Sequence, residues 1–359
     1  MKFTIIAIIL LTLVFNPVVF AQGDKDIKRE DKVSTFNAMN YFDATMAKVE
    51  KALSPVDVLT GPIKSKLRDN NIDLNFFAGA LQGYDNNVNL DPDRKKDTFT
   101  DISLNTEVFY NYTPDIRLKV ENDSTGIIYY NVTSADLVDI DTRAGLEVDL
   151  MDDRFTLGGD CAFDYVLFPN DKDGTYMGYE LSGFLKNYMT PTIYHRIRYK
   201  WLLKYYSHDK TINGSKKRTD ENRQDDRNAV DYEIGWYIQD RFILKTNFEL
   251  YYNNSNYQYF DYYDYWSFRL RPSIIFMITK KLSTSGSITY QRRNYNDRLS
   301  TENDTHVKDN TLSFNVSLLY DISRSFTVAI NYSYRENYSN EPLQRYSGSM
   351  ATAGVYYSF

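Results

Sequence analysis

The feature that most constrains this chain is a period-two alternation of apolar and polar residues, repeated from about residue 71 to the C-terminus. In 312–320 the apolar set runs from Leu312 to Tyr320 at every second position, and mostly small or polar residues lie between. The stretch 326–334 has the same pattern. Because successive side chains of a strand point to opposite faces, each stretch predicts a β-strand with one apolar and one polar face.

Short and long connections separate these stretches in strict alternation. Tight turns are expected at 113–115, 152–153, 190–191, 239–241, 280–281 and 323–324, and longer polar segments near 85–97, 122–135, 168–175, 207–228, 253–264, 295–309 and 336–345. We therefore predict about fourteen strands, with approximate ranges 71–84, 98–112, 115–122, 136–150, 154–168, 175–188, 192–206, 228–238, 241–253, 264–278, 281–295, 309–321, 325–336 and 345–359. The third range has the weakest pattern, and Tyr130 is an alternative end for it.

An even number of strands with short turns on one side and long loops on the other is typical of membrane-spanning barrels. A soluble β-sandwich also has alternating strands, but strands of about 12–15 residues exceed the usual length of about 5–6 in globular sheets. Tyrosines lie near the strand ends of the apolar face, as expected at a membrane interface. We predict an all-β fold: a transmembrane antiparallel up-and-down β-barrel over 71–359, with a short N-terminal helix.

The N-terminal region divides into two segments. Residues 1–21 have the basic start, apolar run and small residues of an export signal, with cleavage expected after Ala21. Residues 22–70 are predicted to be a periplasmic N-terminal segment, with an amphipathic helix over about 34–53. The apolar face of this helix is a candidate plug of the lumen or a contact for a periplasmic partner bound through 24–62; it comprises Phe36, Met39, Met46 and Val49. A highly charged lumen matches this face poorly, which favours the periplasmic position.

The composition agrees with a barrel. The chain has 32 Tyr and 21 Phe but a mean hydropathy of -0.52, as expected when lipid-facing and lumen-facing residues alternate. The single cysteine, Cys161, excludes an intrachain disulfide framework; its parity places it on the lipid face, where we expect it to be inert. The net charge of -6 gives no sign of a nucleic-acid partner.

The C-terminal residues resemble a known class of protein. The segments 330–337 and 353–359, with a strand–turn–strand unit over 320–328, are similar to β-barrel porin families of proteobacterial outer membranes. The resemblance implies a barrel in the outer membrane of a Gram-negative bacterium, surrounded by the lipid bilayer, with both termini periplasmic; it implies no substrate. Such a barrel is inserted by an assembly machinery, and the expected assembly signal consists of Val355, Tyr357 and Phe359.

Strand parity predicts which charged residues face the lumen. One acidic wall is expected at Asp139, Asp141, Glu147, Asp149, Asp160 and Asp164. One basic wall, well round the circumference from it, is expected at Arg196, Arg198, Lys200, Lys204, Arg269 and Arg271. An Arg or Lys facing lipid at the bilayer midplane costs about 2–4 kcal/mol, so these charges belong inside.

The predicted function is a porin-like channel for passive or weakly selective diffusion of small polar or charged solutes. Alternatively, the same charged side chains form ion pairs across the barrel that close the lumen and stabilise it. Two other functions stay open: an export conduit for a polysaccharide or other secreted polymer served by periplasmic partners, and a structural or ligand-binding surface barrel. The sequence leaves the oligomeric state open.

The chain offers little catalytic chemistry. His195 has lipid-facing parity, and His208 and His306 fall in or beside predicted loops. Neighbours along a strand point to opposite faces, so Ser207 and Asp209 do not form a triad with His208. The segment 170–174 has the oxygens of part of a calcium loop but lacks the distal glutamate. We expect no enzymatic activity, no cofactor and no metal.

Overall fold

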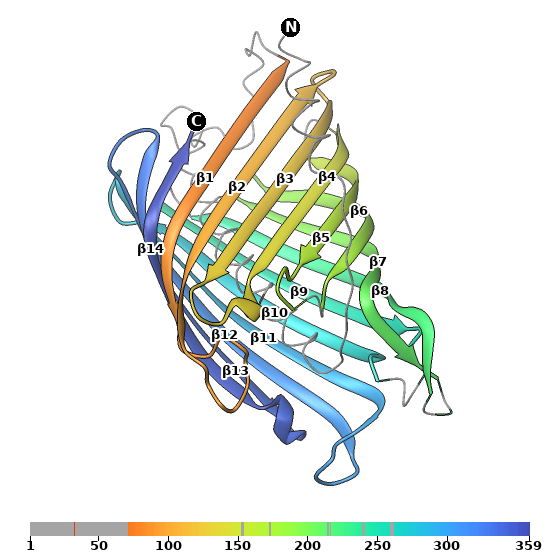
Figure 1. Cartoon of the computed structure of the whole chain (residues 1–359). Helices are drawn as coiled ribbons and strands as arrows, with labels where there is room; N and C mark the ends of the chain where they lie inside the picture. The colour runs from red at the N-terminus through yellow and green to blue at the C-terminus, as the bar shows by residue number, and fades with distance from the viewer. Residues whose placement is uncertain are drawn as a thin grey trace, which may run out of the picture.

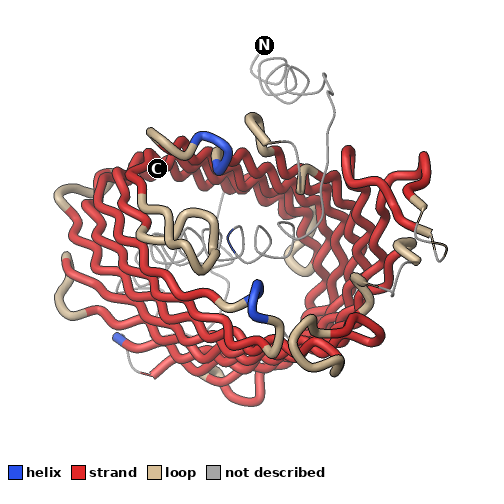
Figure 2. The backbone as a smooth tube through the Cα atoms, turned by 60° about the horizontal axis from the view of Figure 1, so that its bottom comes forward, coloured by secondary structure: helices blue, strands red, loops and turns tan. Residues whose placement is uncertain are grey.

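The structure is a computed structural model that describes residues 32, 71–151, 154–171, 174–213, 215, 217–238, 241–258 and 262–359. These residues form fourteen antiparallel strands that close into one barrel, in which each strand pairs with its neighbour in the chain and β1 pairs with β14. Figure 2 shows the closed ring of strands. The all-β barrel prediction is therefore confirmed. The export signal at 1–21 and the helix at 34–53 lie outside the described residues.

Figure 1 shows the strands of the barrel. Their bounds are β1 Ile72–Asp85, β2 Asp97–Asn111, β3 Ile116–Tyr129, β4 Leu137–Leu150, β5 Phe155–Leu167, β6 Tyr176–Thr190, β7 Ile193–Ile212, β8 Arg218–Ile238, β9 Phe242–Ser255, β10 Tyr265–Met277, β11 Leu282–Leu299, β12 His306–Asp321, β13 Phe326–Ser339 and β14 Tyr346–Ser358. Two short 3-10 turns, at Thr133–Ala135 and Pro342–Gln344, lie in the long connections. Among these described elements, no helix is long and apolar enough to cross a membrane.

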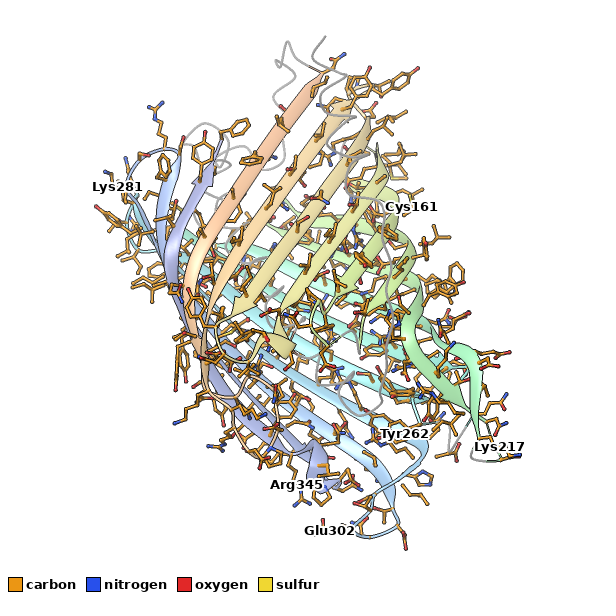
Figure 3. All side chains as sticks on the ribbon, in the orientation of Figure 1. Cys161, Lys217, Tyr262, Lys281, Glu302 and Arg345 are labelled. Carbon is orange, nitrogen blue, oxygen red and sulfur yellow. The ribbon has the colours of Figure 1, made fainter. Side chains whose placement is uncertain are left out.

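Three predicted loops are shorter than expected because strands continue into them. Strand β3 extends to Tyr129, one residue before the alternative end at Tyr130. The segment 207–228 is largely strand, since β7 runs to Ile212 and β8 begins at Arg218. Likewise β11 runs to Leu299. The extensions of β7, β8 and β11 are rich in charged and polar residues, so their sequence resembles loops although their backbones pair beyond the barrel rim. Figure 3 shows Lys217 at the tip of the β7–β8 hairpin.

The two faces of the barrel wall differ in composition. Large apolar side chains are exposed on the outside all round the barrel, as at Leu146 (44%), Ile197 (52%) and Leu318 (42%). The alternate side chains face inward and are mostly polar. An apolar band on the outer face is what a membrane-spanning barrel presents to lipid. Cys161 is exposed on this outer face.

The seam between β1 and β14 closes the barrel (Figure 1). Its register runs from Phe77 opposite Ser358 to Asp85 opposite Met350. Beyond it, the backbones of Phe76 and Phe359 exchange two hydrogen bonds of 3.2 Å. Gly354 is required there, because a Cβ atom at this position would lie 2.1 Å from the carbonyl oxygen of Ala80. The terminal residue is thus part of the seam.

Candidate functional site

The inner wall of the barrel is the candidate site, and it divides into three sectors by charge. Strands β2–β5 form an acidic sector and β6–β10 form a basic sector. Strands β11–β14 and β1 form a third sector, called the uncharged sector because hydroxyl and amide side chains line most of it; its inward charges, such as Arg293, Asp309 and Arg335, lie towards the long-loop end. Each sector covers a continuous part of the circumference because neighbouring strands are also neighbours in the chain.

The acidic sector contains all six residues of the predicted acidic wall. Asp139 and Asp160 are buried, and the other four are half-buried; these are Asp141, Glu147, Asp149 and Asp164. Strands β2 and β3 add inward acids that were not predicted, including Glu107 and Glu121. The weak sequence pattern of β3 concealed Glu121, whereas Glu107 lies at a polar position of the alternation in β2 and was overlooked.

Bases within the acidic sector pair with many of these acids. Arg117 forms an ion pair with Glu147. Lys119 lies 3.1 Å from Glu107 and also pairs with Glu121. Arg143 reaches Glu180 of β6 at 3.1 Å and Asp141 at 3.7 Å. Asp141 keeps a side chain 36% exposed, so it is open to water in the lumen.

The basic sector contains the six residues of the predicted basic wall and the acids that pair with them. Glu249 of β9 contacts both Lys200 and Arg269, the latter at 3.0 Å. Glu233 of β8 lies 3.4 Å from Arg196. Both glutamates were missed in the sequence, although the period-two pattern of β8 and β9 places them inside. Of the remaining predicted bases, Lys204 lies over the ring of a tyrosine in β6, Arg271 is half-buried on β10, and Arg198 pairs across sectors.

The expected separation between the two walls is wrong. Arg198 of β7 lies 3.4 Å from Asp160 of β5, so the walls meet across a single strand, β6. Side chains on strands two places apart are close enough because Arg is long and the intervening Ser182 is short; Ser182 also donates a hydrogen bond of 3.1 Å to Asp160. The lumen is therefore acidic on one side and basic on the adjoining side.

The uncharged sector presents short hydroxyl and amide side chains. They are buried at Ser283, Ser285, Ser287, Thr311, Asn315, Ser317, Asn331, Ser333 and Thr352. Several bond to each other: Asn331 donates to Thr352 at 3.1 Å and Thr311 to Asn337 at 3.0 Å. Asn315, Ser317, Asn331 and Ser333 are polar positions of the alternation in 312–320 and 326–334. The sequence therefore contained a signal for part of this sector, although the prediction did not identify it as a wall of the lumen.

The remaining sequence candidates are dispersed. His195 lies on the outer face and contacts Tyr232. His208 is buried on β7, not in a loop, and His306 begins β12. Within the described residues no group of three His, Cys, Asp or Glu is placed to hold a metal ion. The expected assembly signal points outward: Val355, Tyr357 and Phe359 are 47%, 38% and 54% exposed.

No protein-family model matches the chain, and no curated protein matches it. Among solved structures, the Vibrio cholerae outer membrane protein OmpT (in-vitro folded, trimer form) is similar with a TM-score of 0.45 and 8% identity, over 81% of this chain and 100% of its own. An anion-selective porin from Comamonas acidovorans is similar with a TM-score of 0.44 and 10% identity, over 80% of this chain and 99% of its own. A mutant of the TodX monoaromatic hydrocarbon channel is similar with a TM-score of 0.44 and 9% identity, over 86% of this chain and 93% of its own. Likenesses this distant transfer no function to this chain.

Proposed function

We propose that this chain is an outer-membrane channel, of the porin kind, for the diffusion of small polar or charged solutes. The observation that carries the proposal is a closed barrel whose outer face is apolar and whose inner face carries mostly polar side chains. A barrel of this size is wider than the eight-stranded barrels that side chains fill. The adjoining acidic and basic sectors supply a field across the lumen that acts on charged solutes.

The exposure of the charged side chains supports a wet lumen. Arg117, Arg196 and Lys200 have side chains 33%, 26% and 22% exposed, although each is ion-paired. Burying charges away from water costs several kcal/mol for each ion, so a wall this dense in charge is compatible with water along it. The outward side chains of Val355, Tyr357 and Phe359, beside the seam, support recognition by a barrel assembly machinery.

Conductance across a planar lipid bilayer tests the proposal. The folded, purified chain is expected to give discrete steps of current, and a salt gradient across the bilayer is expected to give a non-zero reversal potential. The control is the same chain with Arg269 and Lys200 both replaced by Gln, in which the reversal potential is expected to shift towards cation preference. A chain that inserts, as shown by its protease-resistant barrel, yet carries no current in any variant excludes the proposed function.

A further inference from the structure

Four of the short turns share one hydrogen-bond arrangement. In the β10–β11 turn, the hydroxyl of Thr279 accepts hydrogen bonds from the backbone N–H groups of Lys281 at 3.1 Å and Leu282 at 3.0 Å. The hydroxyls at the start of the β2–β3, β6–β7 and β12–β13 turns accept the same two bonds at 3.0–3.3 Å; they belong to Thr113, Thr190 and Ser323. A hydroxyl that caps the turn in this way leaves the side chains of the two tip residues unused.

The tip residues of these four turns differ in charge. The β6–β7 turn has the neutral tip Pro191–Thr192, and the β2–β3 turn has Pro114–Asp115. The β10–β11 turn instead has Lys280 and Lys281, and the β12–β13 turn has Arg324. All three bases are exposed, and none of them forms an ion pair in the part of the chain that the structure describes. Since the turn does not require these side chains, their charge is available to a partner.

The two basic turns are direct neighbours. The backbone N–H of Asp321 donates to the carbonyl oxygen of Lys281 at 2.9 Å, and Arg324 follows Asp321 by three residues. The carboxylate of Asp321 accepts a 2.6 Å hydrogen bond from Thr327. Lys280, Lys281 and Arg324 thus form one basic rim patch on the short-turn end of the barrel. Figure 3 shows Lys281 at the end of the barrel opposite to Glu302.

The basic rim patch lies just beyond the apolar outer face. The residue before each turn hydroxyl is apolar and exposed, Ile278 at 39% and Ile322 at 58%. Phe326, two residues after Arg324, is 49% exposed, and its ring centroid lies 5.2 Å from that of Tyr357. Two residues of strand span about 7 Å, and the headgroup layer of one leaflet is about 5–8 Å thick. With the apolar face in hydrocarbon, the bases lie at the depth of lipid phosphates.

The chemistry of the patch fits a phospholipid with a negatively charged headgroup. Bases beside a membrane surface attract anionic lipids, and a guanidinium binds a phosphate with two parallel N–H groups. The exposed Ile278 and Ile322 contact acyl chains of the lipid whose phosphate the bases bind. An acidic soluble protein would use the bases alone and would leave these two apolar side chains without a function.

We propose that the basic rim patch binds the headgroup of an anionic phospholipid in the leaflet around the short-turn rim, whereas the β2–β3 and β6–β7 turns have no such preference. The barrel is thereby lipid-selective on one side, next to the strands that lead to the seam. The site lies on the outside of the barrel and does not rest on the proposed channel function.

The test is native mass spectrometry of the full chain in a neutral detergent, with equal amounts of dioleoylphosphatidylglycerol and dioleoylphosphatidylcholine as probes. The unmodified chain is expected to retain phosphatidylglycerol preferentially. One base near a membrane surface changes the affinity about five-fold at low salt. K280P/K281T, which gives the β10–β11 turn the tip of the β6–β7 turn, is therefore expected to lower the preference about ten-fold or more, and R324P about five-fold. A salt concentration of about 0.5 M is expected to weaken the preference of the unmodified chain.

Two further variants separate charge from turn geometry. K280Q/K281Q removes the same two charges without proline and is expected to reproduce the loss. P191A/T192A changes the tip of an uncharged turn and is expected to keep the preference. The heat-modifiable folded band on a gel shows whether each variant folds.

Equal retention of the two lipids by the unmodified chain overturns the inference and leaves an acidic protein as the partner of the patch. An unchanged preference in both double-lysine variants also overturns it. Conductance is a separate readout: lipid preference without current supports the patch and excludes the channel, whereas current without lipid preference overturns the patch and leaves the channel intact.

Discussion

The charged sectors and the uncharged sector of the lumen satisfy their polar groups in different ways. In the charged sectors long side chains reach across strands, as Arg143 reaches Glu180 and Arg198 reaches Asp160. In the uncharged sector short side chains bond to the adjacent strand, as Asn331 does to Thr352. The charged sectors therefore set the field in the lumen, and the uncharged sector depends on close packing of short side chains and backbone.

The largest loss of stability is expected from a substitution at the β1–β14 seam, in the uncharged sector. G354A places a methyl group 2.1 Å from the carbonyl oxygen of Ala80, and the backbone there has no room to move without breaking pairing with β1. We expect a loss of more than about 3 kcal/mol, beyond the usual range of overpacking, measured as loss of the heat-modifiable folded band on a gel. G286A is the control, since its nearest atom is 3.7 Å away. Equal folding of both variants would contradict close packing at the seam.

The next largest loss of stability is expected when the ion pairs of the basic sector are broken. E249Q leaves Lys200 and Arg269 without their shared carboxylate, and we expect the free energy of unfolding in urea to fall by about 1–3 kcal/mol, less than for a fully buried pair because both bases are partly exposed. T311V in the uncharged sector removes one hydrogen bond to Asn337 and is expected to cost about 1 kcal/mol. A larger loss in T311V than in E249Q would reverse the comparison.

Ion selectivity is expected to depend on the charged sectors and not on the uncharged sector. D141N removes the charge of an acid whose side chain is 36% exposed, and we expect the ratio of cation to anion permeability to fall about two-fold at low salt, with a smaller change at 1 M salt, where the screening length is about 3 Å. Reversal potentials in a KCl gradient measure the ratio. T289V, in the uncharged sector, is the control. A shift in T289V as large as that in D141N would sink the assignment of the field to the charged sectors.

The smallest change in stability is expected from a substitution outside the lumen. Arg345 and Glu302 form an ion pair of 3.0 Å on the long-loop rim, with side chains 51% and 55% exposed (Figure 3). Exposed pairs of this kind contribute about 0–1 kcal/mol, so R345Q is expected to change the unfolding free energy by less than about 0.5 kcal/mol. A loss comparable to that of E249Q would show that rim contacts, not only the lumen wall, hold the barrel together.

The sequence was most informative where one face of a strand is apolar. The alternation in 312–320 and 326–334 located β12 and β13 closely, and Thr113, Pro114 and Asp115 marked the turn after β2. Prediction failed in 207–228, because both faces of a hairpin beyond the membrane are polar and the alternation disappears there. The sequence left the end of β3 open between residue 122 and Tyr130, and the structure places it at Tyr129.

For the candidate site, parity placed the charged side chains inside but did not identify their partners. Glu233 and Glu249 lie more than 30 residues from Arg196 and Lys200 along the chain, and only the register of β7, β8 and β9 brings them together. The contact between Lys32 and Val88 joins residues 56 positions apart. Local pattern contains no information on such contacts.

The sequence alone determined that this chain forms long antiparallel strands with an apolar and a polar face, since a period of two permits no other regular structure. It also determined which side chains share a face. The tertiary structure decided the order of charge around the lumen, the meeting of acidic and basic walls across β6, and the close approach of Gly354 to Ala80. Strand register and closure of the ring fix these distances, and both are properties of the whole barrel.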